Sequence, residues 1–262
     1  MKKHYFLFFA LLAAPLWAAP NSATVDFLQK LNGYYYCLSR EGLKDYRCSL
    51  TCSLTPESEK ALKAQGILEP RVWGAMRDFH FRVMDAAGSP ISIEGSPAAK
   101  TGDPSLDGQV EKLEQAILES LRGFFQSWKG LVVEVLNEPA DIAQGKIRFH
   151  REANGFKVLQ GDPATGEVEG TFDMKGKLLE MSLPGEDGEV SLKPRFTYTK
   201  KGYLFQGLTM TTPQVQQAFA LAYGVQGRYW LPRAMTARLR LKGLANTDIE
   251  LIFGFTDYRV EP

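Results

Sequence analysis

The sequence has little of what catalysis and metal binding require. Of its three histidines, only His80 and His150 lie beyond the N-terminal hydrophobic segment. No nucleophile-elbow glycine pattern, phosphate loop or metal-binding histidine pair is present. A catalytic histidine needs a nucleophile or a carboxylate converging on it, yet both histidines fall in predicted strands and point away from their apolar neighbours. We therefore expect exposed histidines and no enzymatic activity, metal or cofactor.

Paired carboxylates leave one enzymatic alternative open. Glu167 with Glu169, and Glu186 with Asp187, stand beside glycine-containing turns. Carboxylates are common at such places because they suit turn chemistry and solubility. An envelope hydrolase that uses two facing carboxylates is the alternative, and it requires two such groups on opposite sides of a cleft.

An excess of charge is also missing, since 31 Lys and Arg stand against 30 Asp and Glu. Nucleic-acid binding requires clustered positive charge, so we expect no nucleic-acid partner. After the N-terminal segment, no hydrophobic run approaches the ~20 residues that a membrane-spanning helix needs.

The N-terminus has the order of a secretory signal peptide. Lys2 and Lys3 precede an apolar run over residues 6–16, and the small residues Ala18 and Ala19 follow. We predict cleavage after Ala18, which gives a signal segment at 1–18 and one exported, soluble domain at 19–262. A membrane anchor or a buried helix is the alternative. No cysteine follows the run to carry a lipid.

Cysteines are few, and their number is odd: Cys37, Cys48 and Cys52. In an exported chain this suggests one disulfide and one remaining thiol. Cys48 and Cys52 share one face of a predicted strand about 13 Å apart, too far for a disulfide. Cys37 must then be one partner, and we favour Cys37–Cys48. Three buried thiols are the alternative.

The first hundred residues mix helical and strand patterns. A short helix is predicted at 56–65, and strands are predicted at 46–54 and 78–85, the latter forming a hairpin with residues 91–93. A first helix is predicted from a cap at Thr24 to Gly42, because apolar residues recur at three- and four-residue steps: Val25, Leu28, Leu31, Tyr35 and Leu38.

The clearest element is a helix over residues 104–128, about 37 Å long. Asp103 can cap it, and Pro104 suits its first position. Its apolar stripe consists of Leu106, Val110, Leu113, Ile117, Leu121, Phe124 and Trp128. The charged residues assigned to its other side are Glu111, Glu114, Glu119 and Arg122.

From residue 131 onward the hydrophobic period is two. A hairpin is predicted across Asn154-Gly155, and segment 215–223 is predicted to be a strand, with a helix as its competitor. Pro232 is expected to separate that strand from the next. The further strands fall at 131–135, 147–149, 156–158, 172, 178–183, 190–199, 203–210, 235–241 and 249–260. About a dozen strands joined by short turns indicate a mainly β, antiparallel domain.

Aromatic residues are abundant on these strands: Phe79, Phe81, Phe149, Phe156, Phe172, Phe196, Phe205, Phe219, Phe253 and Phe255. For any single residue an ordinary core position is the simpler interpretation. A sheet of this size needs its apolar face covered, however, and only two substantial helices are predicted. Incomplete cover would leave an apolar groove or pocket.

The last 35 or so residues resemble the ending common in LolA-like periplasmic lipoprotein carriers. The resemblance is carried by Gly227-Arg228-Tyr229-Trp230-Leu231-Pro232, by Ile249-Glu250-Leu251-Ile252-Phe253 and by Asp257-Tyr258-Arg259-Val260. The order of signal, early helix, mid-chain helix and meandering strands is similar over most of the chain. The resemblance implies an unclosed antiparallel β-barrel with a helical lid, located in the periplasm.

We therefore expect a periplasmic carrier or binding protein that holds acyl chains of a lipid or an acylated protein, and that acts as a monomer. The apolar cavity would be lined by Phe79, Phe81, Phe149, Phe156, Phe172, Phe196, Phe219 and Phe253. The lid would present Leu113, Ile117, Leu121 and Phe124. The alternative is a non-enzymatic envelope sensor or assembly factor that binds another envelope protein.

Overall fold

The computed structural model describes residues 30–31, 33–64, 66, 69–85, 91–96, 100–128, 147–162, 166–185, 188–213, 215–241 and 248–261. The predicted signal segment 1–18, the start of the predicted first helix and the predicted strand 131–135 lie outside these residues. None of the helices within these ranges is long and apolar enough to cross a membrane.

Twelve antiparallel strands form one sheet in the described part of the chain. Their order is β3-β2-β1-β12-β11-β10-β9-β8-β7-β6-β5-β4, and the two edge strands of this order do not pair with each other. The strands are β1 (Asp45–Leu54), β2 (His80–Asp85), β3 (Ser92–Gly95), β4 (Ile147–Glu152), β5 (Gly155–Asp162), β6 (Gly166–Asp173), β7 (Leu178–Gly185), β8 (Gly188–Thr199), β9 (Gly202–Thr211), β10 (Val215–Gln226), β11 (Tyr229–Leu241) and β12 (Asp248–Glu261). This confirms the predicted mainly β, antiparallel and unclosed class.

The helices are α2 (Pro56–Ala64), α3 (Pro70–Ala75), the 3-10 turn η2 (Met76–Asp78) and α4 (Pro104–Trp128). The ends of α4 agree with the prediction. Oδ1 of Asp103 accepts a hydrogen bond of 3.0 Å from the Ser105 backbone N–H, as a capping residue does. One assignment on α4 was wrong, because Glu114 is buried and not exposed.

The chain divides into two compact units, and β10 passes from one to the other. Unit 1 consists of Met1–Cys37 and Lys129–Ala218, and unit 2 consists of Leu38–Trp128 and Phe219–Pro262. Each unit has its own set of buried residues, so each is described on its own terms.

Unit 1 has a meander of strands packed on the segment around Tyr35. Its core cluster consists of Leu31, Tyr35, Cys37, Phe156, Phe172, Leu178 and Tyr203. The Tyr35 hydroxyl donates to the Gly176 carbonyl (2.8 Å) and accepts from the Leu178 N–H (2.7 Å). The Tyr35 hydroxyl therefore supplies hydrogen-bond partners to one backbone carbonyl and one backbone N–H at the β6–β7 turn.

The predicted first helix is wrong in its C-terminal half. Tyr35 forms a parallel bridge with Tyr203, and the backbone N–H of Tyr36 donates to the Tyr203 carbonyl (2.9 Å). Gly33, a poor helix former, precedes this extended segment. Pairing with β9 therefore overrides the helical spacing of Tyr35 and Leu38. A smaller correction concerns the β4–β5 hairpin, where Gly155 already pairs with Glu152 and the turn falls at residues 153–154.

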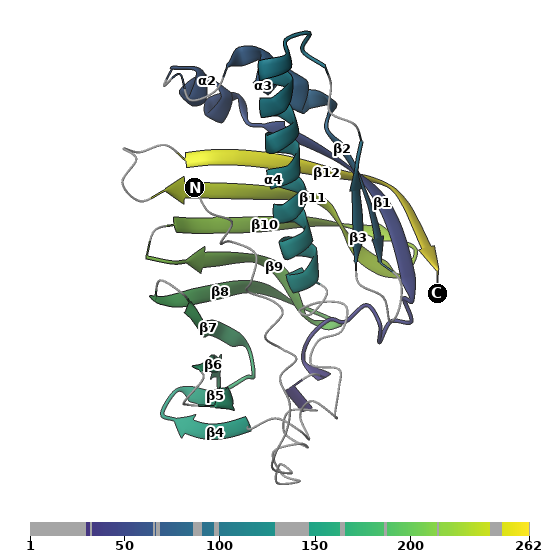
Figure 1. Cartoon of the computed structure of the whole chain (residues 1–262). Helices are drawn as coiled ribbons and strands as arrows, with labels where there is room; N and C mark the ends of the chain where they lie inside the picture. The colour runs from purple at the N-terminus through teal and green to yellow at the C-terminus, as the bar shows by residue number, and fades with distance from the viewer. Residues whose placement is uncertain are drawn as a thin grey trace. The chain divides into compact units, whose positions relative to one another are not determined.

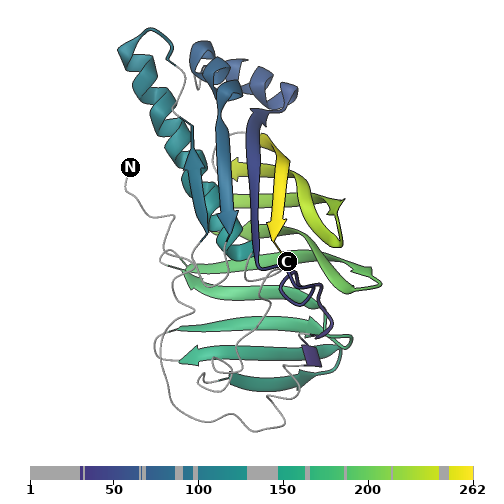
Figure 2. The same cartoon turned by 90° about the vertical axis from the view of Figure 1, so that its right-hand side faces the viewer.

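Unit 2 places β1 between β12 and β2 and covers one face of its sheet with α4. The alternation predicted for β1 is confirmed, since Tyr46, Cys48, Leu50 and Cys52 are all buried. Figure 1 shows α4 running across β10, β11 and β12. Figure 2 shows β1, β2 and β3 side by side, with α2 and α3 beyond their end. We call the sheet face toward α4 the inner face of unit 2.

Pro232 lies inside β11, whereas the sequence predicted a break there. β11 pairs with β12 from Ala234 to Arg240, so Pro232, which has no N–H, lies outside that ladder. The Pro232 carbonyl accepts a hydrogen bond from the Tyr258 hydroxyl on β12. The segment 215–223, in contrast, is a strand as predicted.

The predicted Cys37–Cys48 disulfide is not formed. All three cysteines are buried as thiols. Cys48 stands opposite Val83 on β2, and Cys52 stands opposite Phe253 on β12. Cys48 also forms a hydrogen bond with Tyr258. The alternative of three buried thiols therefore describes the structure.

Candidate functional site

The inner face of unit 2 is an aromatic and aliphatic surface beneath α4. Phe125 meets Phe255 edge-on, with ring centroids 6.0 Å apart, and Phe124 meets Phe219 at 5.6 Å. Ile117 and Leu121, also on α4, are buried. The amphipathic helix therefore covers the sheet with its apolar stripe, as helices of this kind do.

The structure brings the predicted cavity and lid residues together as two groups. Unit 2 holds Phe79, Phe81, Phe219, Phe253, Leu113, Ile117, Leu121 and Phe124. Unit 1 holds Phe149, Phe156, Phe172 and Phe196. Within unit 1, Phe156 and Phe172 stack at 5.0 Å in the core cluster. Among the described residues, the long helix α4 covers the face that holds the unit 2 group, so that face is the candidate site.

The apolar inner face of unit 2 continues past its fully buried part. Met235 and Phe253 are buried and pair across β11 and β12. The next inward pairs, Ala237 with Leu251 and Leu239 with Ile249, are half-exposed. We call these four residues the alkyl row. It carries no polar group, and its side chains are the aliphatic continuation of the surface that α4 covers.

The opposite face of the same two strands is charged and paired. Nε of Arg238 lies 2.9 Å from Oε2 of Glu250, and Nε of Arg240 lies 2.6 Å from Oδ1 of Asp248. The hydrogen bond from Arg240 lowers the pKa of Asp248. Arg238 and Arg240 are thus matched by carboxylates on the outer face, whereas the alkyl row presents only alkyl groups on the inner face.

A carboxylate lies within the apolar contact of α4. Glu114 is 6 % exposed, and its Oε1 has no hydrogen-bond partner among the described residues. The group lies over Gly95 of β3, where an added Cβ would stand 3.0 Å from that oxygen. Burial raises the pKa of Glu114, and the charge of Glu111 adds to the effect. An ionised Glu114 therefore opposes the docking of α4.

Two side-chain hydrogen bonds join α4 to the sheet within the described ranges. The indole N–H of Trp128 donates to the Tyr223 hydroxyl at 3.2 Å. Nη2 of Arg122 reaches the Ile93 carbonyl at 3.5 Å, the limit of a useful hydrogen bond. Trp128 also packs edge-on against Tyr46, with centroids 5.8 Å apart. Apolar packing therefore holds most of the helix in place.

The buried thiols in unit 2 are poorly suited to chemistry. Burial raises the pKa of both Cys48 and Cys52 to about 12. A hydrogen bond with Tyr258 partly offsets the effect at Cys48. Because the thiolate is the reactive form, both side chains act as small apolar core residues.

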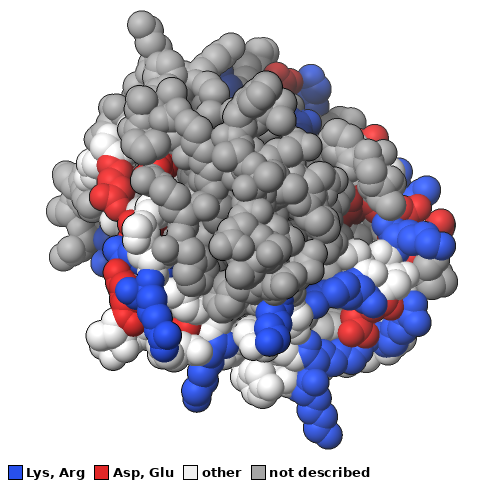
Figure 3. All heavy atoms as spheres, turned by 90° about the horizontal axis from the view of Figure 1, so that it is seen from below, with Lys and Arg blue, Asp and Glu red and all other residues white. Residues whose placement is uncertain are grey.

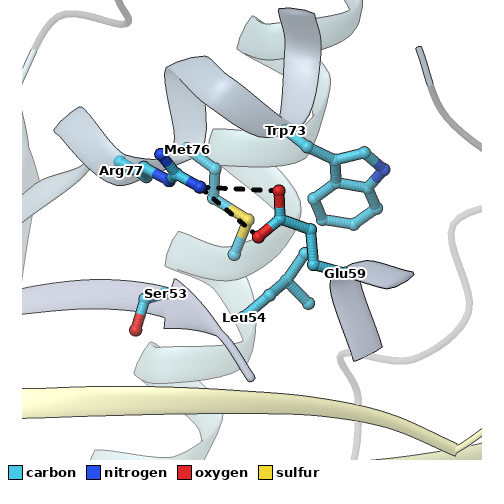
Figure 4. A pocket seen from close by; sticks show the side chains of 6 residues that line it. All are labelled: Ser53, Leu54, Glu59, Trp73, Met76 and Arg77. Carbon is cyan, nitrogen blue, oxygen red and sulfur yellow. Dashed lines mark hydrogen bonds and ion pairs between the residues drawn. The ribbon is translucent and has the colours of Figure 1, made fainter. Parts of the chain in front are cut away.

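A small pocket lies between the end of β1 and the helices α2 and α3 (Figure 4). It has a volume of about 30 Å³ and is lined by Ser53, Leu54, Glu59, Trp73, Met76 and Arg77. Lys63 Nζ lies 2.6 Å from Glu59 Oε1, and Arg77 also reaches this carboxylate. The hydrogen bond from Lys63 is the first cause of the lowered pKa of Glu59. This volume holds one or two water molecules at most.

Neither histidine belongs to the inner face of unit 2. His80 and His150 are exposed on β2 and β4, as the alternation predicted. On the face seen in Figure 3, acidic and basic side chains of the described residues lie side by side. The alkyl row and the buried Glu114 were missed at the sequence level. Spacing of two in 235–241 and 249–255 could have indicated the first.

Comparison with known proteins identifies no family for this chain. No family model, curated protein or solved structure matches it. Its function must therefore be inferred from the residues of the candidate site.

Proposed function

We propose that the protein is a non-catalytic carrier or binding protein that holds acyl chains of a lipid or lipoprotein on the inner face of unit 2. The observation that supports this most is the alkyl row, which extends the face covered by α4 and remains half-exposed. Apolar surface that stays partly exposed beside a buried core often marks a binding site for a ligand, a membrane or another protein. The resemblance to LolA-like carriers favours the same function.

The alkyl row suits a hydrocarbon chain better than a polar ligand. Its four side chains offer no hydrogen-bond donor or acceptor, so they contribute no orientation to a polar molecule. A bound acyl chain would gain about 0.8 kcal/mol for each CH₂ group removed from water. The chain would enter along β11 and β12 and continue toward Met235 and Phe253 as α4 gives way.

Displacement of α4 is the opening step of this proposal. Among the described residues, the side-chain hydrogen bonds from α4 to the sheet come from Arg122 and Trp128, and Oε1 of Glu114 has no partner there. Acyl groups can replace the apolar contacts of Ile117 and Leu121 without loss of burial. When α4 moves away, the acyl chain therefore replaces it as the apolar cover of the sheet, and the free-energy cost of displacing the helix is low.

Binding is tested with a dansyl-labelled fatty acid whose fluorescence rises in an apolar site. Leu251→Glu or Leu239→Glu places a charge on the alkyl row and should lower the affinity by about tenfold or more, because the desolvated carboxylate has no partner. Ile252→Glu is the matched control, since Ile252 is the next residue on β12, faces outward and is 38 % exposed. Equal binding by all three variants, or no binding by the wild type, would overturn the proposal.

Native mass spectrometry of gently purified protein gives a second test. Copurified lipid supports the acyl carrier. A copurified envelope protein without lipid would favour the sensor or assembly factor instead.

Export to the periplasm is part of the same proposal. It is supported by the basic start, apolar run and small residues of the N-terminus. Cell fractionation with N-terminal sequencing of the product is the measurement. We expect a soluble product that starts after Ala18. Cytoplasmic retention with an intact Met1 would contradict it.

A further inference from the structure

The outer face of unit 2 has a hollow that contains three arginines. Its volume is about 280 Å³, and its lining is Arg47, Cys48, Ser49, Arg82, Met84, Asp257 and Arg259. These residues come from the adjacent strands β1, β2 and β12. Arg47, Arg82 and Arg259 are all exposed. Arg47 and Ser49 alternate with the buried Cys48 and Leu50, so the hollow lies on the face opposite to α4.

Strand register brings the three positive charges together. Arg47 stands directly opposite Arg259 across the β1–β12 pair, which places their Cα atoms about 4.5–5.5 Å apart. On the other side, Arg47 pairs with Met84 and Ser49 pairs with Arg82. Arg82 is therefore diagonal to Arg47, about 7–8 Å away. Like charges in such positions destabilise a sheet.

A β-bulge shapes one wall of the hollow. The β1–β12 register shifts between Arg47 and Ser49, so two residues of β12 oppose one of β1. Asp257, in the bulge, has φ 54° and is the one non-glycine residue with positive φ in the described part of the chain. Bulges re-aim side chains and recur next to binding sites. Here the bulge turns Asp257 outward, beside Arg259.

The three arginines lack a carboxylate partner within the described ranges. Neither Asp257 in the lining nor Glu94, the register partner of Arg82, forms an ion pair with them. The Asp257 carboxylate instead accepts a hydrogen bond of 3.0 Å from the Thr256 hydroxyl. Arg238 and Arg240, on the same outer face, are each paired with an acid. The hollow therefore keeps an uncompensated positive charge.

We propose that this hollow binds a phosphate group, either of a free phosphate compound or of a lipid headgroup. Guanidinium groups bind phosphate oxygens in bidentate fashion, and three of them converge from three strands. An anion would relieve the repulsion between Arg47 and Arg259. The site is independent of acyl binding, which concerns the inner face.

Two probes distinguish a free phosphate compound from a lipid headgroup: inorganic phosphate and lipid vesicles. Calorimetric titration with phosphate, at constant ionic strength set with sodium chloride, should give one site per chain. Arg47→Gln and Arg82→Gln should weaken it about 10- to 100-fold, the worth of a hydrogen bond to a charged group. Vesicles of phosphatidylglycerol in phosphatidylcholine are then compared with phosphatidylcholine alone. Binding of free phosphate, or of the phosphatidylglycerol vesicles only, supports the site and identifies the source.

Arg238→Gln is the matched control, because its charge is already paired on the same face. A second readout protects against misfolded variants. Without phosphate, Arg259→Gln should raise the melting temperature, since it removes the like-charge pair, and phosphate should no longer raise it further. If neither phosphate nor the anionic vesicles bind, or if the hollow variants and Arg238→Gln bind alike, the proposal is overturned.

Discussion

The two units cover their apolar faces by different means. In unit 1 the cover is an extended segment that joins the hydrogen-bond pattern of the strands it covers. The Tyr203 N–H donates to the Tyr34 carbonyl (2.7 Å), and the Tyr36 N–H donates to the Tyr203 carbonyl (2.9 Å). The Tyr35 hydroxyl adds two buried bonds at the β6–β7 turn. This cover is fixed by directional bonds.

In unit 2 the cover is α4, whose backbone hydrogen bonds lie within the helix. Its contact with the sheet consists mostly of aromatic and aliphatic packing, which is not directional. One oxygen of Glu114, within that contact, has no hydrogen-bond partner in the part of the chain that the structure describes. A helix held mainly by apolar burial can therefore be replaced by another apolar group, whereas a segment held by backbone hydrogen bonds cannot. Unit 2 is therefore the better candidate for ligand binding.

The largest expected effect on stability comes from removing the Trp128 side chain, which holds the C-terminal end of α4 against the sheet. Trp128 is fully buried, packs on Tyr46 and Phe125, and donates to Tyr223. Trp128→Ala should lower the free energy of unfolding by about 3–5 kcal/mol, as such core truncations do. Urea unfolding measures the loss. Hydrogen exchange should show reduced protection in unit 2 but not in unit 1. The matched control is Glu119→Ala on the exposed side of α4. Equal loss of protection in both units would remove the distinction.

A smaller effect on stability is expected when the Tyr35 hydroxyl of unit 1 is removed. Tyr35→Phe removes one hydroxyl and leaves the Gly176 carbonyl and the Leu178 N–H without their buried partner. We expect a loss of about 2–3 kcal/mol in the free energy of unfolding, because unsatisfied buried groups are costly. Tyr34→Phe is the control, since Tyr34 is 45 % exposed and should change stability by less than about 0.5 kcal/mol. A Tyr35→Phe variant as stable as this control would show that packing fixes the segment.

Much of the fold could be predicted from hydrophobic spacing. A period of two identified β1 and β12, and it chose correctly between strand and helix for β10. The caps and stripe of α4 gave both of its ends. These elements are decided by local pattern, and tertiary contacts agree with it. The helix predicted through Tyr35 failed because pairing with Tyr203 is a non-local contact that no spacing reveals.

The sites were harder to predict than the fold. Glu114 follows Val110 by four residues and precedes Leu118 by four, so helical geometry places it with buried neighbours. Because it is charged, Glu114 was predicted to be exposed, and that prediction was wrong. The meeting of Arg47 with Arg259 depends on a strand register that includes a bulge. Residues more than 200 positions apart cannot be paired from one sequence by pattern alone.

The smallest expected effect concerns Glu114 and tests how freely α4 can leave. Because burial raises the pKa of this carboxyl group, the folded state favours its protonated form. Its contribution to stability is therefore complete below the unfolded pKa of about 4.3 and is lost as pH rises through the raised value. Glu114→Gln should abolish this loss and stabilise the protein at pH 7 by about 1 kcal/mol.

The measurement is the free energy of unfolding from pH 4 to pH 8 for the wild type, Glu114→Gln and the control Glu119→Gln. Glu59 and Asp248, whose pKa values are lowered, destabilise all three proteins alike at acidic pH, so only differences between variants are read. The free energy of unfolding of Glu114→Gln should exceed that of the wild type by an amount that grows with pH. The control Glu119→Gln should follow the wild type. A difference that stays flat would mean that Glu114 is solvated in the folded protein. In that case, Glu114 would not weaken the docking of α4, and the proposed ease of opening would rest on the apolar contacts alone.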